Sequence, residues 1–139
     1  MAARTFINLP TKDVAAAGCF AEGLGLTKKA DWCNSNHSIA FAWGDHIIFF
    51  WHDYETFSKW LVPGRGIADP GSGTQSIMTL SMDSREHVDK AISSAIEGGG
   101  KKGPIMVPEE EQEKWGMYSR SVQDPDGHLF EIIHSTAQM

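Results

Sequence analysis

The sequence has little cysteine and no long apolar run, and each shortage excludes a class of protein. Its 139 residues include two cysteines, Cys19 and Cys33, which lack the spacing of a CxxC motif and therefore predict reduced thiols. The longest apolar run, residues 47–51, has the length of a strand, whereas a membrane helix needs about 20 apolar residues. We therefore expect neither a disulfide-stabilised domain nor a membrane protein.

Positive charge is scarce as well, because 12 Lys and Arg against 18 Asp and Glu give a formal net charge of −6. Nucleic-acid binding normally needs a basic face, and the basic clusters are only the pairs at 28–29 and 101–102, so we expect no nucleic-acid partner. An acidic surface is compatible with a cationic small molecule. The first ten residues, MAARTFINLP, lack the layout of a signal peptide, so a cytoplasmic location is expected.

Strand-like and helix-like segments follow one another in the same order twice. In each half a strand precedes an apolar helix, which Asp13 caps in the first half and Ser84 in the second, and three strands follow. Residues 108–114 form an acidic loop between two of them. The expected strands are 4–9, 27–33, 37–43, 46–53, 76–82, 102–107, 115–122 and 128–135.

The repeat predicts an α+β fold of two tandem βαβββ modules. One module cannot bury both faces of its sheet, but two together can curve into a half-open barrel around a cleft, with the helices outside. We predict a single domain over residues 1–139, with a first module at 1–53 and a second at 75–139. A Gly- and Pro-rich linker, residues 54–74, joins them, with a short helix at its start.

A βαβββ unit in tandem with these residues resembles the vicinal-oxygen-chelate superfamily, which holds glyoxalase I, bleomycin-resistance proteins and extradiol dioxygenases. The resemblance covers nearly the whole chain and rests on residues 13–26, on 81–100 and, above all, on DPDGHLFE at 124–131. FINLP at 6–10, MDSRE at 82–86 and GMY at 116–118 are similar to a lactoylglutathione-lyase-related subgroup. The resemblance implies a homodimer, often with clefts completed across subunits.

Metal-using members of the superfamily place four ligands in the cleft, one from the first and one from the fourth strand of each module. Aligning the two halves matches Phe6 with Ile77 and Phe49 with Glu131, so these residues occupy the four positions. Of these side chains, Glu131 alone can ligate, and one carboxylate does not hold a divalent cation against water. We therefore expect no metal and no other cofactor.

The histidines leave one alternative open. The same alignment matches His46 with His128 and His52 with His134, and the first pair lies next to turns, where structural roles explain it. His52 and His134 have the opposite parity to the aligned ligand positions, so they should face away from the cleft. A rearranged site that uses His52, Asp53 or His134 is the alternative.

Alternation along the strands predicts an aromatic and aliphatic cleft with few polar groups. Trp115, after the acidic loop, could rim it, and Arg120 is a candidate partner for Glu131, because an unpaired buried carboxylate is costly. A structural Arg120–Glu131 pair and a general-base role for Glu131 are both open. The predicted ligand-binding residues are Phe6, Asn8, Phe49, Trp51, Ile77, Thr79, Trp115, Arg120 and Glu131, and Glu131 is the candidate catalytic residue.

Three functions compete at this point. The first is a metal-independent protein that binds a small aromatic or cationic organic molecule, as bleomycin-resistance proteins do. The second is a glyoxalase-like lyase or isomerase, or a dioxygenase, that uses Glu131. The third is a structural or interaction role with a filled cleft. The count of ligand positions favours the first, and the resemblance to the lyase-related subgroup favours the second.

Overall fold

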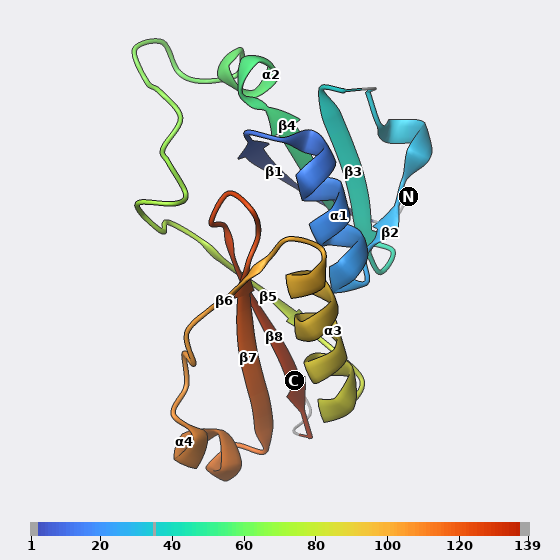
Figure 1. Ribbon diagram of the computed structural model, residues 1–139, viewed down its shortest axis with the longest axis vertical. Helices are drawn as coiled ribbons and strands as arrows, with labels where there is room; N and C mark the ends of the chain where they lie inside the picture. Colours follow the sequence, from blue (N-terminus) through green and yellow to red (C-terminus); the bar gives the residue numbers. More distant parts are fainter. Residues whose placement is uncertain (1–2, 35, 137–139) are drawn as a thin grey trace.

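Two four-stranded sheets form the frame of the protein (Figure 1), in a computed structural model that describes residues 3–34 and 36–136. The first sheet has the order β1 (Thr5–Thr11), β4 (Ile47–Asp53), β3 (Ser38–Trp43) and β2 (Thr27–Lys28). The second has the order β5 (Ile77–Ser81), β8 (Leu129–Ser135), β7 (Met117–Gln123) and β6 (Lys101–Lys102). The chain therefore has the predicted α+β fold of two βαβββ modules.

Strand pairing is the same in both sheets. The first strand of each module lies parallel to the fourth, as β1 to β4 and β5 to β8, and the remaining neighbours are antiparallel. In a parallel pair, residues directly opposite each other point to the same face of the sheet. This register fixes which side chains share a face, and it decides the candidate site below.

Two helices begin where the sequence predicts them. The carboxylate of Asp13 accepts the N–H of Ala16 at the start of α1 (Val14–Leu24), and the hydroxyl of Ser84 accepts the N–H of His87 at the start of α3 (Arg85–Glu97). The two helices pack against each other across the modules. A Cβ at Gly23 would lie 2.4 Å from the carbonyl oxygen of Ser94, so the close approach requires glycine there.

One hydrophobic core serves both modules. Buried side chains of the first sheet and of α1 pack with those of the second sheet and of α3. Leu9 and Leu80 face this core, as alternation predicts. Its largest fully buried members are Phe20, Phe41, Phe49, Trp51 and Phe130.

Three segments differ from the sequence-based expectation. The strands expected at 27–33 and 102–107 are two residues long each, because residues 30–32 turn into a short 3-10 helix and Pro104 lacks the N–H that a longer β6 would need. The acidic segment expected as a loop forms α4 (Glu109–Lys114). Three of its four glutamates lie in the first turn, where the helix dipole favours negative charge.

The linker begins with α2 (Tyr54–Ser58) and then runs without helix or strand through residues 59–76. The Asp53 carboxylate accepts the N–H of Thr56 at 2.8 Å and a hydrogen bond from Nδ1 of His37 at 2.7 Å. These bonds, first from Thr56 and then from His37, lower the pKa of Asp53 to about 2. Within the described residues, no helix is long and apolar enough to cross a membrane.

Candidate functional site

Each sheet has one face against α1 and α3 and one face that these two helices leave uncovered. We call the uncovered faces the first open face and the second open face. The first carries Phe6, Asn8, Ser38, Ala40, Ala42, Ile48, Phe50 and His52. The second carries Ile77, Thr79, Ser81, Ser119, Ser121, Leu129, Glu131 and Ile133.

Aromatic rings form a row on the first open face. The ring of Trp32 lies parallel to that of Phe50, with an angle of 9° and 6.5 Å between centroids. The ring of Phe50 stacks in turn on His52 at 5.3 Å, with an angle of 5°. Trp60, from the linker, meets His52 edge-on at 4.7 Å. Stacked rings of this kind present flat apolar surface to a planar ligand.

A chain of hydrogen bonds fixes His52 on this face. Nδ1 of His52 lies 2.6 Å from Oγ of Ser38, and Nε2 lies 2.8 Å from Oδ1 of Asn8. Burial lowers the pKa of His52, while the Asp53 carboxylate opposes that shift, so the ring is neutral near pH 7. Because the Asn8 oxygen can only accept, Nε2 carries the proton and Nδ1 accepts from Ser38. The carboxamide N–H₂ of exposed Asn8 is then free to donate.

Glu131 is the charged group of the second open face. Its Oε1 accepts a hydrogen bond from Thr79 at 2.9 Å, and its Oε2 accepts one from Ser119 at 2.6 Å. The side chain is half-buried. Two hydroxyl donors from neighbouring strands therefore hold the carboxylate in one orientation, with room for a further donor from a ligand.

Arg120 is not the partner of Glu131, because it lies on the opposite face of β7. Its guanidinium sits 4.1 Å over the ring of Tyr118 and reaches the carboxylate of Glu109 at 3.3 Å. Alternation along the strand explains the separation, since Ser119 and Arg120 point to opposite sides. Trp115 is 57% exposed at the end of α4, outside the strands that carry the open faces.

The sequence-based prediction that Phe49 and Trp51 line the cleft is wrong. Both are fully buried in the core on the helix side, and Phe50 and His52 occupy the open face instead. Parallel pairing puts Phe50 opposite Asn8 just as Glu131 lies opposite Thr79, so Phe50 is the true counterpart of Glu131. An alignment that is shifted by one residue assigns every side chain of the strand to the opposite face of the sheet.

The error comes from aligning the two halves on His46 and His128. Strand pairing places Ile48 opposite Phe6 and Leu129 opposite Ile77, so Ile47, and not His46, matches His128. The alignment was therefore one residue out of register along β4. Phe50, like Phe49, has no atom that can ligate a metal. The β4 position that matches Glu131 therefore offers no metal ligand in either alignment. The structure brings together Phe6 with Asn8, and Ile77 with Thr79 and Glu131, as expected.

Similarity to solved structures identifies the fold. No protein-family model and no curated protein matches the sequence. A glyoxalase/bleomycin resistance protein/dioxygenase family enzyme from Burkholderia phytofirmans PsJN matches with a TM-score of 0.72 and 19% identity, over 96% of this chain and 98% of that one. The chain has the glyoxalase/bleomycin-resistance fold.

Two further solved structures that match this chain belong to proteins with different functions. Lactoylglutathione lyase from Agrobacterium tumefaciens matches with a TM-score of 0.65 and 18% identity, over 96% of this chain and 94% of that one. A bleomycin resistance determinant encoded on the transposon Tn5 matches with a TM-score of 0.59 and 18% identity, over 98% of this chain and 100% of that one. The glyoxalase/bleomycin-resistance fold thus occurs both in an enzyme and in a resistance protein. The fold alone therefore does not determine which of these functions this chain has.

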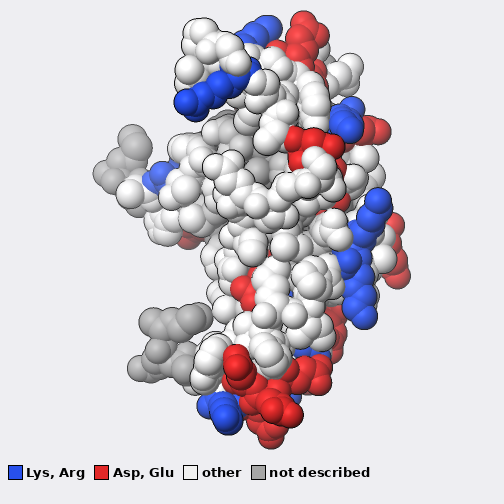
Figure 2. All heavy atoms as spheres, turned by 90° about the vertical axis from the view of Figure 1, so that its left-hand side faces the viewer, with Lys and Arg blue, Asp and Glu red and all other residues white. Residues whose placement is uncertain are grey.

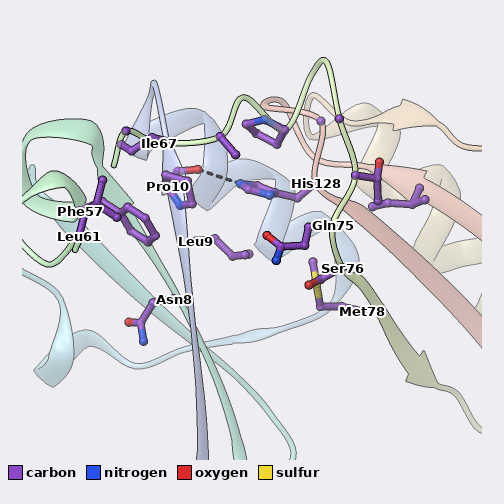
Figure 3. Close-up of a pocket in the computed structure, with 17 residues that line it drawn as sticks. Asn8, Leu9, Pro10, Phe57, Leu61, Ile67, Gln75, Ser76, Met78 and His128 are labelled. Carbon is purple, nitrogen blue, oxygen red and sulfur yellow. Dashed lines mark hydrogen bonds between the residues drawn. The ribbon is translucent and has the colours of Figure 1, made fainter. Parts of the chain in front are cut away.

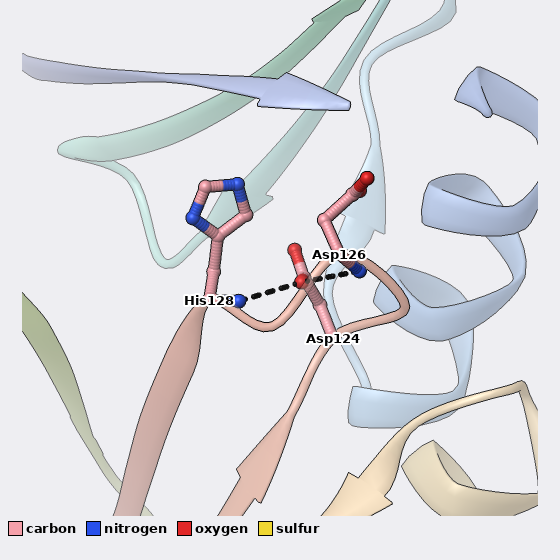
Figure 4. Close-up of side chains that lie close together, drawn as sticks. All are labelled: Asp124, Asp126 and His128. Atoms are coloured by element: carbon pink, nitrogen blue, oxygen red, sulfur yellow. Dashed lines mark hydrogen bonds between the residues drawn. The ribbon is translucent and has the colours of Figure 1, made fainter. Parts of the chain in front are cut away.

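A group of three potential metal ligands lies in the turn between β7 and β8 (Figure 4). Asp124, Asp126 and His128 each offer one ligand atom within 4.8 Å of the others. No sequence pattern predicted this group, although all three residues belong to the DPDGH segment. Whether it binds an ion depends on what else these atoms already contact.

Hydrogen bonds already engage all three residues of this group. Oδ1 of Asp124 accepts three backbone N–H groups of its own turn, at 2.9 to 3.0 Å, and Oδ2 accepts Nε1–H of Trp51 at 2.9 Å. Asp126 accepts from the hydroxyl of Thr11 and the N–H of Lys12, while Nε2 of His128 donates to the carbonyl of Pro10. The turn therefore joins the second module to β1 and β4 of the first.

Burial explains the electrostatics of this turn. It raises the pKa of Asp124, which is fully buried, while His128 and the bond from Trp51 favour the charged form. Four N–H donors around one carboxylate are what a structural role requires.

Proposed function

We propose that the protein binds a planar, aromatic and cationic small molecule, and that it does so without the four-ligand metal site implied by the resemblance to metal-using members of the superfamily. The observation that carries the proposal is the contrast between the two open faces. The first offers the stacked rings of Trp32, Phe50 and His52, and the second offers the carboxylate of Glu131, held by hydroxyls. Rings stack on a flat ligand, and the carboxylate pairs with its positive charge.

We also propose that a homodimer assembles this cleft. Phe6 and Ile77, on the edge strands β1 and β5 of the two open faces, are 49% and 50% exposed. The chain exposes 8419 Å², compared with roughly 7,100 Å² for a compact monomer of its mass. A standard interface removes about 800 Å² from each partner, so the excess of about 1,300 Å² is large enough for one such interface.

The charge distribution supports the same arrangement. The side of the molecule in Figure 2 carries Lys, Arg, Asp and Glu mainly at its ends and along one edge, and its middle is largely uncharged. A second copy whose second open face meets the first open face of this chain would bring rings and carboxylate to the same ligand. Dimers with two such clefts follow from twofold symmetry.

Fluorescence titration tests the binding proposal. Proflavine, a planar cation, and acridine, its planar analogue that is neutral at pH 7.5, are titrated against the tryptophan emission of the protein. We expect saturable quenching by both, with proflavine bound more tightly. Glu131→Gln should weaken proflavine about tenfold, the loss of one charge-assisted contact, and leave acridine unchanged. Equal affinities of the variant and the parent for proflavine would contradict the role of Glu131.

The second candidate is a metal-dependent lyase or dioxygenase, which the lactoylglutathione lyase structure and the Asp124–Asp126–His128 group favour. Elemental analysis after mild dialysis separates it from the first, with Glu131→Gln and Asp126→Asn as paired variants. A stoichiometric divalent metal that is lost in Glu131→Gln would place an enzyme site on the second open face. A metal lost only in Asp126→Asn would place it at the turn.

A further inference from the structure

A cavity of about 340 Å³ lies beneath the linker, apart from the rings and the carboxylate of the open faces (Figure 3). Leu9 and Pro10 of β1 form one side, and Gln75, Ser76 and Met78 at the start of β5 form the other. The linker covers it. Neither Phe50 nor Glu131 lines the cavity.

The chemistry of the walls defines the class of ligand. Apolar side chains from β1, the linker and β8 make up most of the lining, among them Leu9, Phe57, Ile67, Met78 and Leu129. Among the described residues that line it there is no Asp, Glu, Lys or Arg, so an ionic ligand would find no countercharge. The Nε2–H of His128 is taken by the carbonyl of Pro10.

A few polar groups remain for orientation. Oδ1 of Asn8 is occupied by His52, so its N–H₂ is the group left to reach a carbonyl or hydroxyl oxygen. The exposed side chains of Gln75 and Ser76 add a carboxamide and a hydroxyl. Apolar walls with sparse polar groups, at the small end of the usual 300 to 1,000 Å³ range, are typical of small-molecule sites.

We propose that this cavity binds one neutral, mainly apolar small molecule that carries a hydrogen-bonding oxygen or nitrogen. Because its walls come from both modules and from the linker, such a ligand stabilises their packing and raises the melting temperature. This site is separate from the stacked rings and from Glu131, although Asn8 and Leu129 belong both to its lining and to the open faces.

N-phenylnaphthylamine, a neutral dye that brightens in apolar surroundings, is the probe. Gly66 and Gly73 line the cavity, and a Cβ at either would meet nothing within 4 Å without a positive φ. Gly66→Trp and Gly73→Trp therefore add bulk at the cavity without backbone strain, and Gly66→Ala and Gly73→Ala are their matched controls. Phe50→Ala and Glu131→Gln report on the open faces.

We expect saturable binding of one dye per chain. At least one tryptophan variant should weaken it tenfold or more, while its alanine control, Phe50→Ala and Glu131→Gln retain it. No saturable binding, full affinity in both tryptophan variants, or loss in Phe50→Ala overturns the proposal. Should the tryptophan variants fail to fold, Overhauser contacts between the dye and the labelled methyl of Met78 in the parent protein decide: their presence supports the cavity, and their absence overturns it.

Discussion

His52 and Asn8 lie on neighbouring strands of the first sheet, and Nε2–H of His52 donates to Oδ1 of Asn8 over 2.8 Å. Ser38 donates to the other ring nitrogen, so both nitrogens of one imidazole are engaged on the open face. The arrangement fixes the ring tautomer, and it orients the Asn8 N–H₂ group away from His52. It also makes His52 sensitive to pH.

The first prediction concerns that sensitivity. The pKa of His52 is lowered in the folded protein, chiefly by burial, so between this value and 6.5 the unfolded chain binds more protons. The His52 contribution to stability is therefore fully present above pH 6.5 and is lost as pH falls toward the folded pKa. We expect the free energy of unfolding, measured in urea, to fall less between pH 7.5 and pH 5 in His52→Gln than in the parent.

Asn8→Asp provides the opposite test on the same hydrogen bond. A carboxylate beside Nε2 favours the imidazolium, so the His52 pKa should rise relative to the parent. Carbon–proton NMR of the imidazole rings measures both values directly. A parent His52 that titrates at or above 6.5, or an Asn8→Asp variant with no increase, would show that the ring is not held as the structure has it.

The second prediction compares two adjacent phenylalanines of β4. Phe49 is fully buried in the core, and Phe49→Ala should cost about 3 to 5 kcal/mol of unfolding free energy. Phe50 is half-buried on the open face, so Phe50→Ala should cost about 1 kcal/mol and weaken acridine and proflavine about tenfold. Urea unfolding and the quenching titration measure the two effects. Similar losses of stability in both variants would contradict the assigned faces.

The third prediction concerns the turn that joins the modules. Asp124→Ala leaves the indole N–H of Trp51 and three backbone N–H groups without their acceptor, at a cost of about 3 kcal/mol. Trp51→Phe removes the indole donor and part of the ring volume, but it leaves the turn's own bonds intact. A larger loss of unfolding free energy in Asp124→Ala than in Trp51→Phe would show that the turn's own bonds contribute, and a loss below 1 kcal/mol in Asp124→Ala would show that these bonds contribute little.

The fourth prediction is a dimer that depends on the open faces. Light scattering coupled to size-exclusion chromatography should give a dimer for the parent. Ile77→Glu should shift it to monomer, because a charge then replaces an apolar group at the proposed interface. Ile96, 39% exposed on α3, supplies the matched control, and Ile96→Glu should stay dimeric. A monomeric parent, or an unaffected Ile77→Glu, would rule this interface out.

Much of the fold could be predicted from local signals. Asp13 and Ser84 cap helices because each is a short polar side chain directly before an apolar helical repeat. Leu9 and Leu80 face the core because alternation along a strand requires no knowledge of its neighbours. The placement of Glu131 with Leu129 and Ile133 follows for the same reason.

The sequence could not predict which residues lie opposite one another on different strands. The match of Phe49 with Glu131 depended on taking His46 and His128 as equivalent, whereas the strand pairing makes Ile47 the counterpart of His128 and Phe50 the counterpart of Glu131. The partner of Glu131 was missed because Thr79 and Ser119 come from two other strands. The only early signal for His52 was its inclusion in an alternative site.

The sequence by itself determined the order of strands and helices, the caps and the alternation, since these depend on residues a few positions apart. Only the tertiary structure decided the faces of β4, the hydroxyl partners of Glu131, the chain from Ser38 through His52 to Asn8, and the cavity under the linker. Each of these depends on strand register and on how two modules pack, and the free energy of that packing is shared among residues far apart in the chain.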